Sequence, residues 1–172
     1  MSEYHALLAK VDAFQAQAEV AQAPWLTCKR GCDGCCRLRR TAWAVEINHL
    51  RTHIQTLAAE RQAELRARRH DPPVVAGQRC VFLDADGSCA VYAARPIICR
   101  THGPAVQTDR GTSWCHLNFV GLTEPEVAQV PGVLDLTRLN TLLSVVNTRY
   151  QAHHPGPARQ PLDAALDEEK PI

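Results

Sequence analysis

The sequence predicts a mainly α protein of the small α+β class, in which helices surround an irregular cysteine-rich module with a short β-hairpin. Three observations predict this fold class. Apolar residues recur every three to four positions in long segments, which is typical of amphipathic helices. Glycines interrupt the densest group of cysteines, and two short apolar runs flank a cluster of turn-forming residues.

The helical periodicity is clear in three segments. They span residues 2–23, 41–69 and 135–152. Pro24 closes the first segment and the third ends before Pro155, as expected because proline lacks the backbone N–H that continues a helix. The middle segment holds no glycine or proline, so it is predicted to form one continuous helix.

Two short apolar runs predict the β-hairpin. Residues 80–83 and 89–92 have β-compatible side chains, and the residues between them favour a turn. The stretch from Asp84 to Gly87 also resembles the start of a calcium-binding loop. The twelfth position of such a loop requires a glutamate, however, and it is occupied here by Arg95. A hairpin turn is therefore the better interpretation.

The remaining segments have less regular patterns. Pro96 is expected to open a short helix that reaches Cys99, since proline is tolerated in a first helical turn, whereas residues 103–113 are predicted to be a loop. The segment 155–172 contains four prolines and an acidic run, and we expect a flexible tail there. Residues 1–154 then form a single helical domain that contains all the cysteines.

The overall composition excludes several classes of protein. Of the 172 residues, 45% are hydrophobic and 22% are charged, a balance sufficient for a folded core. No apolar run approaches the roughly 20 residues of a membrane span, and the first residues lack the layout of a signal peptide. We therefore expect a cytoplasmic protein with no membrane partner. A net charge of +1 argues against a nucleic-acid partner, for which a basic surface is typical.

Cysteine is the most informative residue type. Without an export signal the thiols are expected to stay reduced, and reduced thiols at short spacings are more often metal ligands than disulfides. The chain holds eight cysteines in a dense and a dispersed group: Cys28, Cys32, Cys35 and Cys36, then Cys80, Cys89, Cys99 and Cys115. A C-x2-C step lets two thiolates converge on one ion at about 2.3 Å from each sulfur. These eight cysteines are therefore the candidate metal ligands.

Cys35 and Cys36 are adjacent, which limits what they can bind together. Neighbouring side chains diverge by roughly 100° on a helix and point to opposite faces of a strand. This pair therefore fits two metal centres, or one multinuclear centre, better than a single mononuclear site. Thiolate clusters carry negative charge that nearby cations and N–H donors can offset. Arg95 and Arg100, on either side of Cys99, are the main candidates for that role, and the basic residues after the dense cysteine group are the others: Arg37, Arg39 and Arg40.

The pattern C-x3-C-x2-C-C is followed by CVFLDADGSCAVYAARPIICR and a later cysteine. This arrangement resembles the YkgJ-type cysteine-cluster family, a family of zinc- or iron-chelating domains. The similarity runs from Cys28 to Cys115, and it implies that all eight cysteines are metal ligands. Arg95, Pro96 and Arg100 match the family's RPxxCR signature. What the resemblance implies is metal binding, with no particular reaction attached.

The sequence therefore favours a metal-binding protein that chelates zinc or iron through clustered thiolates, an iron–sulfur or multinuclear centre included. An alternative is an iron or iron–sulfur dependent redox or modification enzyme that keeps one metal position open. His102 and His116 lie close in sequence to Cys99 and Cys115 and are additional candidate ligands. A metal carrier or sensor, which holds exchangeable metal, is the other alternative.

Overall fold

The computed structural model describes residues 1–29, 31–69 and 79–167. About 52% of this part is helical and its strands form only small sheets, which confirms the predicted mainly α, small α+β class. None of its helices has the length and apolar content that a membrane crossing requires. The chain forms two compact units. The first unit comprises Met1–Lys29 and Ile97–Arg149, and the second unit comprises Arg30–Pro96 and Tyr150–Ile172.

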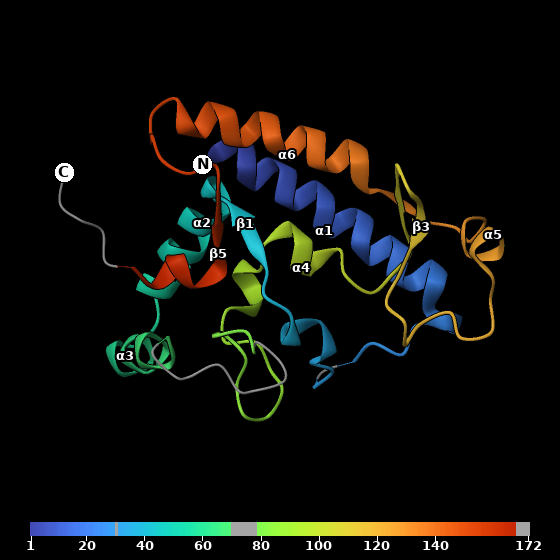
Figure 1. The fold of residues 1–172 in the computed structure, drawn as a ribbon, viewed down its shortest axis with the longest axis horizontal. Coiled ribbons are helices and arrows are strands. Elements are labelled where there is room, and N and C mark those ends of the chain that lie inside the picture. The colour runs from blue at the N-terminus through green and yellow to red at the C-terminus, as the bar shows by residue number, and fades with distance from the viewer. Residues whose placement is uncertain (30, 70–78, 168–172) are drawn as a thin grey trace. The chain divides into compact units, whose positions relative to one another are not determined.

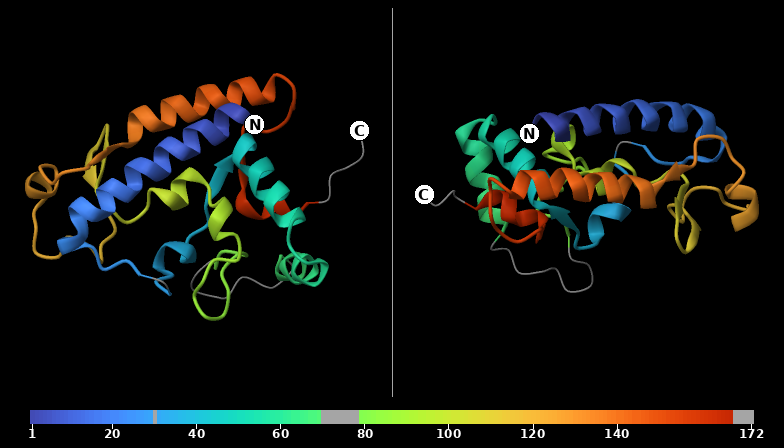
Figure 2. Two further views of the ribbon diagram at one scale, coloured as in Figure 1. Left: turned by 180° about the vertical axis from the view of Figure 1, so that it is seen from behind. Right: turned by 90° about the horizontal axis from the view of Figure 1, so that it is seen from above.

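Two long helices form the frame of the first unit. Helix α1 spans Ser2–Gln22 and helix α6 spans Leu136–Gln151, which confirms the helices predicted near both ends of the chain. The two helices run side by side (Figure 1), and the views from other directions agree (Figure 2). An ion pair joins Arg149 of α6 to Glu3 of α1.

A short helix attaches the segment after Pro96 to this frame. Helix α4 spans Ile97–Arg100 and contacts α1, where Arg100 Nη1 lies 2.7 Å from Asp12 Oδ1. The side chain of Thr101, which follows the helix, donates a hydrogen bond to the carbonyl of Ile97 at 2.9 Å. The short helix expected in this position is therefore confirmed.

A three-stranded sheet in the first unit corrects one prediction. Strand β2 lies between antiparallel β3 and parallel β4, with bounds Val106–Thr108, Gly111–Ser113 and Leu134–Asp135. The predicted loop over 103–113 is wrong, because β2 and β3 form a hairpin there. Thr108 Oγ1 donates to Gly111 O across its turn at 2.9 Å. Strands of three residues are too short to show an alternating pattern in the sequence.

Phe119 lies at the centre of an aromatic cluster in the first unit. Its ring centroid is 6.1 Å from that of Trp25, in a stacked arrangement, and 6.0 Å from that of Trp114. The remaining short helices of this unit are the 3-10 helix η1, Ala23–Trp25, and α5, Glu124–Val127. The two tryptophans are close in sequence to Cys28 and Cys115, so the cluster anchors the segments that carry these cysteines.

The second unit contains two helices where the sequence predicts one continuous helix over 41–69. Its first elements are strand β1, helix α2 and helix α3, with bounds Thr41–Trp43, Ala44–Gln55 and Ala59–Arg68. The prediction is wrong at the start because residues 41–43 pair with another strand. It is wrong in the middle because Thr56 ends α2, and its hydroxyl donates to the carbonyl of His53 at 2.7 Å. A threonine side chain competes in this way with helical backbone bonding.

The C-terminal segment is part of the second unit. Strand β5, Arg159–Pro161, pairs antiparallel with β1, and the 3-10 helix η4, Leu162–Leu166, contacts α2 (Figure 2). The prediction of a flexible tail from residue 155 is therefore wrong for residues 159–166. The backbone of residues 159–161 pairs with β1, and the side chains of Leu162 and Leu166 are buried. Residues 168–172 of that tail lie outside the described residues. Two further 3-10 helices of this unit are η2, Gly34–Arg37, and η3, Tyr92–Ala94.

Candidate metal centre

The grouping of the cysteines in the two compact units differs from the dense and dispersed groups that they form along the sequence. The first unit contains Cys28, Cys99 and Cys115, and the second contains Cys32, Cys35, Cys36, Cys80 and Cys89. Within the second unit, the thiols lie on two segments that we call the 31–37 loop and the 80–92 loop. The spacing along the chain separated these two segments into different groups, whereas the fold brings them together.

The 31–37 loop places two thiols against each other. Gly31 has a φ of +87°, a conformation that favours glycine, and the backbone then turns through η2, where Cys36 N donates to Asp33 O at 2.8 Å. In this turn the thiols of Cys35 and Cys36 are hydrogen-bonded to each other. The two sulfurs are therefore close together despite the divergence expected for neighbouring side chains.

The 80–92 loop is joined to the 31–37 loop by backbone contacts. Cys80 N donates to Cys36 O at 2.8 Å. In place of the predicted hairpin the loop contains turns and a single β-bridge between Leu83 and Cys89. The two predicted runs do lie antiparallel at this point, with hydrogen bonds of 2.8 Å from Asp84 N to Ser88 O and from Ala90 N to Phe82 O, but the pairing extends no further. The bridge nevertheless brings the two ends of the loop, with their cysteines, close together.

Backbone N–H groups point at both sulfurs of the 80–92 loop. The N–H of Phe82 is hydrogen-bonded to the thiol of Cys80, and the N–H of Val91 is hydrogen-bonded to the thiol of Cys89. Each donor lies two residues after the cysteine that it contacts. Such donors stabilise a thiolate, because hydrogen bonds to an ionised acceptor are stronger than those to a neutral one.

Three of these thiols resist ionisation in the metal-free protein. The hydrogen bond to Cys36, followed by burial, raises the pKa of Cys35. Burial raises the pKa of Cys80 and of Cys89, and the charges of the neighbouring thiolates raise both further. The charge of Cys35 acts on both Cys80 and Cys89, and the charge of Cys89 acts on Cys80, so these three thiols lie near one another. A metal ion reverses this preference, since a coordinating thiol is deprotonated outright.

Arginines offset part of this effect. Arg95, predicted for this role, lowers the pKa of Cys89, and its guanidinium lies 3.5 Å from the ring centroid of Tyr92. Arg40 lowers the pKa of Cys35. The sequence offered Arg40 only as one of several basic residues after the dense cysteine group. Arg100, the other predicted residue, belongs to the first unit and pairs with Asp12.

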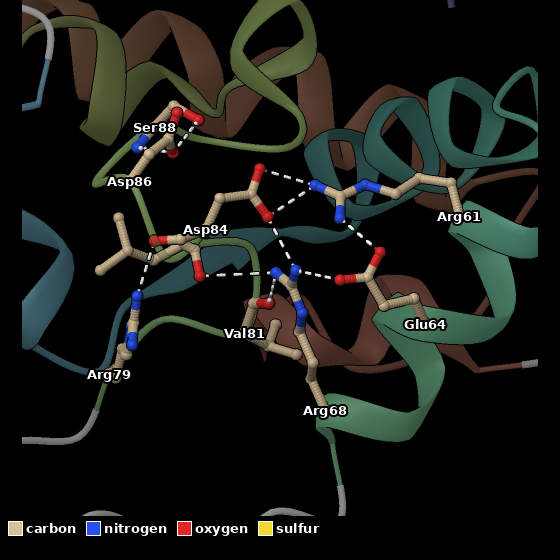
Figure 3. Close-up of polar contacts among 9 residues, drawn as sticks. Arg61, Glu64, Arg68, Arg79, Val81, Asp84, Asp86 and Ser88 are labelled. Atoms are coloured by element: carbon tan, nitrogen blue, oxygen red, sulfur yellow. Dashed lines mark hydrogen bonds and ion pairs between the residues drawn. The ribbon is translucent and has the colours of Figure 1, made fainter.

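An ion-pair network fixes the 80–92 loop to α3 (Figure 3). The carboxylate of Asp84 accepts hydrogen bonds from Arg61 at 2.6 Å and from Arg68 at 2.8 Å, and Glu64 contacts both arginines. Arg79 donates to the carbonyl oxygen of Asp84 at 2.6 Å. The carboxylate of Asp84 therefore pairs with the protein's own arginines and that of Asp86 with Ser88, which agrees with a turn rather than a calcium site. No pattern in the sequence indicated this network.

In the first unit, a buried asparagine organises the surroundings of Cys28. Asn118 Nδ2 lies 3.3 Å from Cys28 Sγ and donates to Gly103 O at 2.8 Å, while its Oδ1 accepts from Thr27 N at 2.9 Å. Cys115 N also donates to Gly103 O, at 3.2 Å. Cys28 and Cys115 are thus held around the same peptide. Nothing in the sequence pattern singled out Asn118.

The two candidate histidines of the first unit differ in exposure. His102 is half-buried and precedes Gly103, whereas His116 is exposed. Across residues 1–29, 31–69 and 79–167, no group of three or more His, Cys, Asp or Glu side chains is positioned to hold a metal ion. The donor set itself suits zinc or iron, because thiolates are preferred ligands of both zinc and iron–sulfur centres. In such sites metal binding and the final ligand positions are coupled.

These features define the class of cysteine-rich metal-binding proteins. A family model described as "CxxCxxCC: putative zinc- or iron-chelating domain" matches residues 27–116, which is more than half of the chain and includes all eight cysteines. The chain therefore belongs to this family, which confirms the resemblance found in the sequence. Comparisons with curated proteins and with solved structures give no match.

Proposed function

We propose that this protein binds zinc or iron through cysteine thiolates, with Cys35, Cys36, Cys80 and Cys89 as the central ligands. The observation that carries the proposal is their grouping. Two segments more than forty residues apart in sequence are joined by the hydrogen bond from Cys80 N to Cys36 O. The charge of Cys35 on one segment raises the pKa of Cys80 and of Cys89 on the other. Four thiolates complete a closed tetrahedral zinc site, and the same number holds an iron–sulfur cluster.

The other cysteines extend the proposed ligand set. Cys32 lies in the 31–37 loop beside the central group, while Cys28, Cys99 and Cys115 are proposed ligands in the first unit. Bound zinc would supply structural cross-links, and an iron–sulfur centre would add redox chemistry. Free thiols of this number favour a reducing compartment such as the cytoplasm.

We propose a structural role for the metal in the second unit. The 31–37 and 80–92 loops contain only short 3-10 turns and one β-bridge, and most of their backbone hydrogen bonds are local. Among the described residues, one backbone hydrogen bond, from Cys80 N to Cys36 O, joins the two loops. Metal ligation from both loops would add further links between them. Structural zinc sites contribute about 10 to 16 kcal/mol of apparent binding free energy at neutral pH, which is comparable to the whole stability of a domain, about 5 to 15 kcal/mol.

Metal analysis of the purified protein tests this proposal. We expect wild-type protein purified without oxygen to contain zinc or iron, and Cys80→Ser to contain less metal per folded chain. Ala85→Ser is the matched control, because it introduces the same side chain at an exposed position of the same loop. It should keep the wild-type metal content. Equal metal content in Cys80→Ser and Ala85→Ser would remove Cys80 from the ligand set.

A further inference from the structure

The contacts of the 80–92 loop with α3 point to a positioning device for its cysteines. We propose that Arg61, Arg68 and Asp84, which we call the clamp, hold this loop in the conformation from which Cys80 and Cys89 bind metal. This inference rests on the proposed function. The clamp residues touch no thiol in the described part of the chain by any hydrogen bond, so they would act through the backbone of the loop.

Helix α3 depends on polar contacts for its place in the second unit. Leu65 is its one buried residue, and the rest of the helix is exposed or half-buried. An amphipathic helix is normally held by a stripe of apolar side chains. The contacts of Arg61 and Arg68 with Asp84 therefore supply a large share of the interactions between α3 and the 80–92 loop. Through them the loop is attached to a regular helix.

Arg68 of the clamp contacts the 80–92 loop at several atoms close to Cys80. Arg68 Nη1 lies 3.5 Å from Val81 O and 3.4 Å from Leu83 O, and Arg68 Nη2 lies 2.8 Å from Asp84 Oδ1 (Figure 3). The Val81 carbonyl belongs to the same peptide group as the N–H of Phe82, which is hydrogen-bonded to the thiol of Cys80. Arg68 thus restrains the peptide group whose amide faces the sulfur, and also the carbonyl of Leu83.

The remaining contacts restrain the other end of the loop. Asp84 N donates to Ser88 O at 2.8 Å, immediately before Cys89. Asp86 Oδ1 accepts from the amide and the hydroxyl of Ser88 at 2.9 and 2.6 Å, as the close-up shows (Figure 3). Asp84 therefore connects the arginines of α3 to the turn that leads into Cys89.

The ion pairs of the clamp are partly shielded from water. Although burial acts to raise it, the hydrogen bonds from Arg61 and Arg68 lower the pKa of Asp84, so its carboxylate stays ionised and paired with both arginines. Only 21% of the Arg68 side chain and 20% of the Asp84 side chain are exposed, so water screens this pair less than a surface ion pair.

Cobalt binding measures the effect of the clamp directly, because Co²⁺ bound by thiolates absorbs visible and near-ultraviolet light. Arg68→Gln removes the charge and the loop contacts. Its matched control is Arg66→Gln, which removes the same charge from the same helix; the contact found for Arg66 is with Gln62 of α3 itself. We expect Arg68→Gln to weaken Co²⁺ and Zn²⁺ affinity about tenfold, as is common when a partner of a metal ligand is lost. Arg66→Gln should change the affinity less than twofold.

A double-mutant cycle separates positioning from general loss of stability. Asp84→Asn should weaken metal affinity like Arg68→Gln, and the double variant should be no weaker than the more affected single variant. Thermal unfolding of the metal-free variants provides the second readout. A merely structural clamp would lower the unfolding temperature of Arg68→Gln and leave its metal dissociation constant within twofold of wild type, which would overturn the inference. Failure of the wild-type protein itself to bind Co²⁺ or Zn²⁺ would instead contradict the proposed function.

Discussion

Gly87 lies where the 80–92 loop meets the 31–37 loop, and its replacement tests whether these loops are packed as described. Its φ is +80°, and an added Cβ would lie 2.9 Å from Gly31 O and 3.2 Å from Gly31 Cα. Both are backbone atoms, which cannot move without displacing a loop. The left-handed conformation costs an alanine about 1 to 2 kcal/mol, and overlap of this kind costs about 1 to 3 kcal/mol more. We predict that Gly87→Ala lowers the free energy of unfolding by about 2 to 5 kcal/mol.

Urea unfolding of the metal-free protein is the assay, and Gly34→Ala is the matched control. Gly34 lies in the 31–37 loop, has no positive φ, and has no atom within 4 Å of an added Cβ. Its replacement should leave stability unchanged or raise it by up to about 1 kcal/mol through lower entropy of the unfolded chain. Metal affinity should fall in Gly87→Ala and persist in Gly34→Ala. Equal stabilities of the two variants would refute the packing of these loops.

Two other predictions concern the asparagine and the thiols. Asn118→Ala should lower the free energy of unfolding by about 2 kcal/mol, because it leaves the Thr27 amide without its acceptor and removes one of the two donors to the Gly103 carbonyl; a loss under about 0.5 kcal/mol would contradict this. The raised thiol pKa values predict that the metal-free protein loses stability as the pH rises above the ordinary thiol value of 9.0, since the thiols of the unfolded chain then ionise while those of the folded state keep their protons. Urea unfolding across that range checks the sign, and stability that rises with pH would be inconsistent with buried thiols.

The helical frame was predictable because its signals are local. The helices near both ends follow from apolar residues at helical spacing, and Pro24 and Pro155 mark where they stop. The break at Thr56 was not predictable, since the apolar periodicity continues through it and the competing hydroxyl contact is visible only in the fold. The packing of residues 159–166 was not predictable, because the prolines and charged residues around them are typical of a flexible segment.

The candidate ligands were predictable as residue types, but their grouping was not. Short spacing identified the thiols as a set, and the family match to residues 27–116 agrees with it. Which cysteines lie together depends on long-range contacts such as Cys80 N to Cys36 O. The same holds for Asp84, whose role depends on two arginines of α3 sixteen or more residues away in sequence.

The central claim is that this protein binds zinc or iron through its cysteines, and metal content per chain tests it most directly. Protein purified without oxygen should be analysed for zinc, iron and acid-labile sulfide, together with its visible absorption spectrum. The account predicts at least one zinc or iron per folded chain, lost on chelation with a decrease in thermal stability. A folded protein that holds neither metal, takes up neither when supplied, and melts at the same temperature with and without chelator would contradict it.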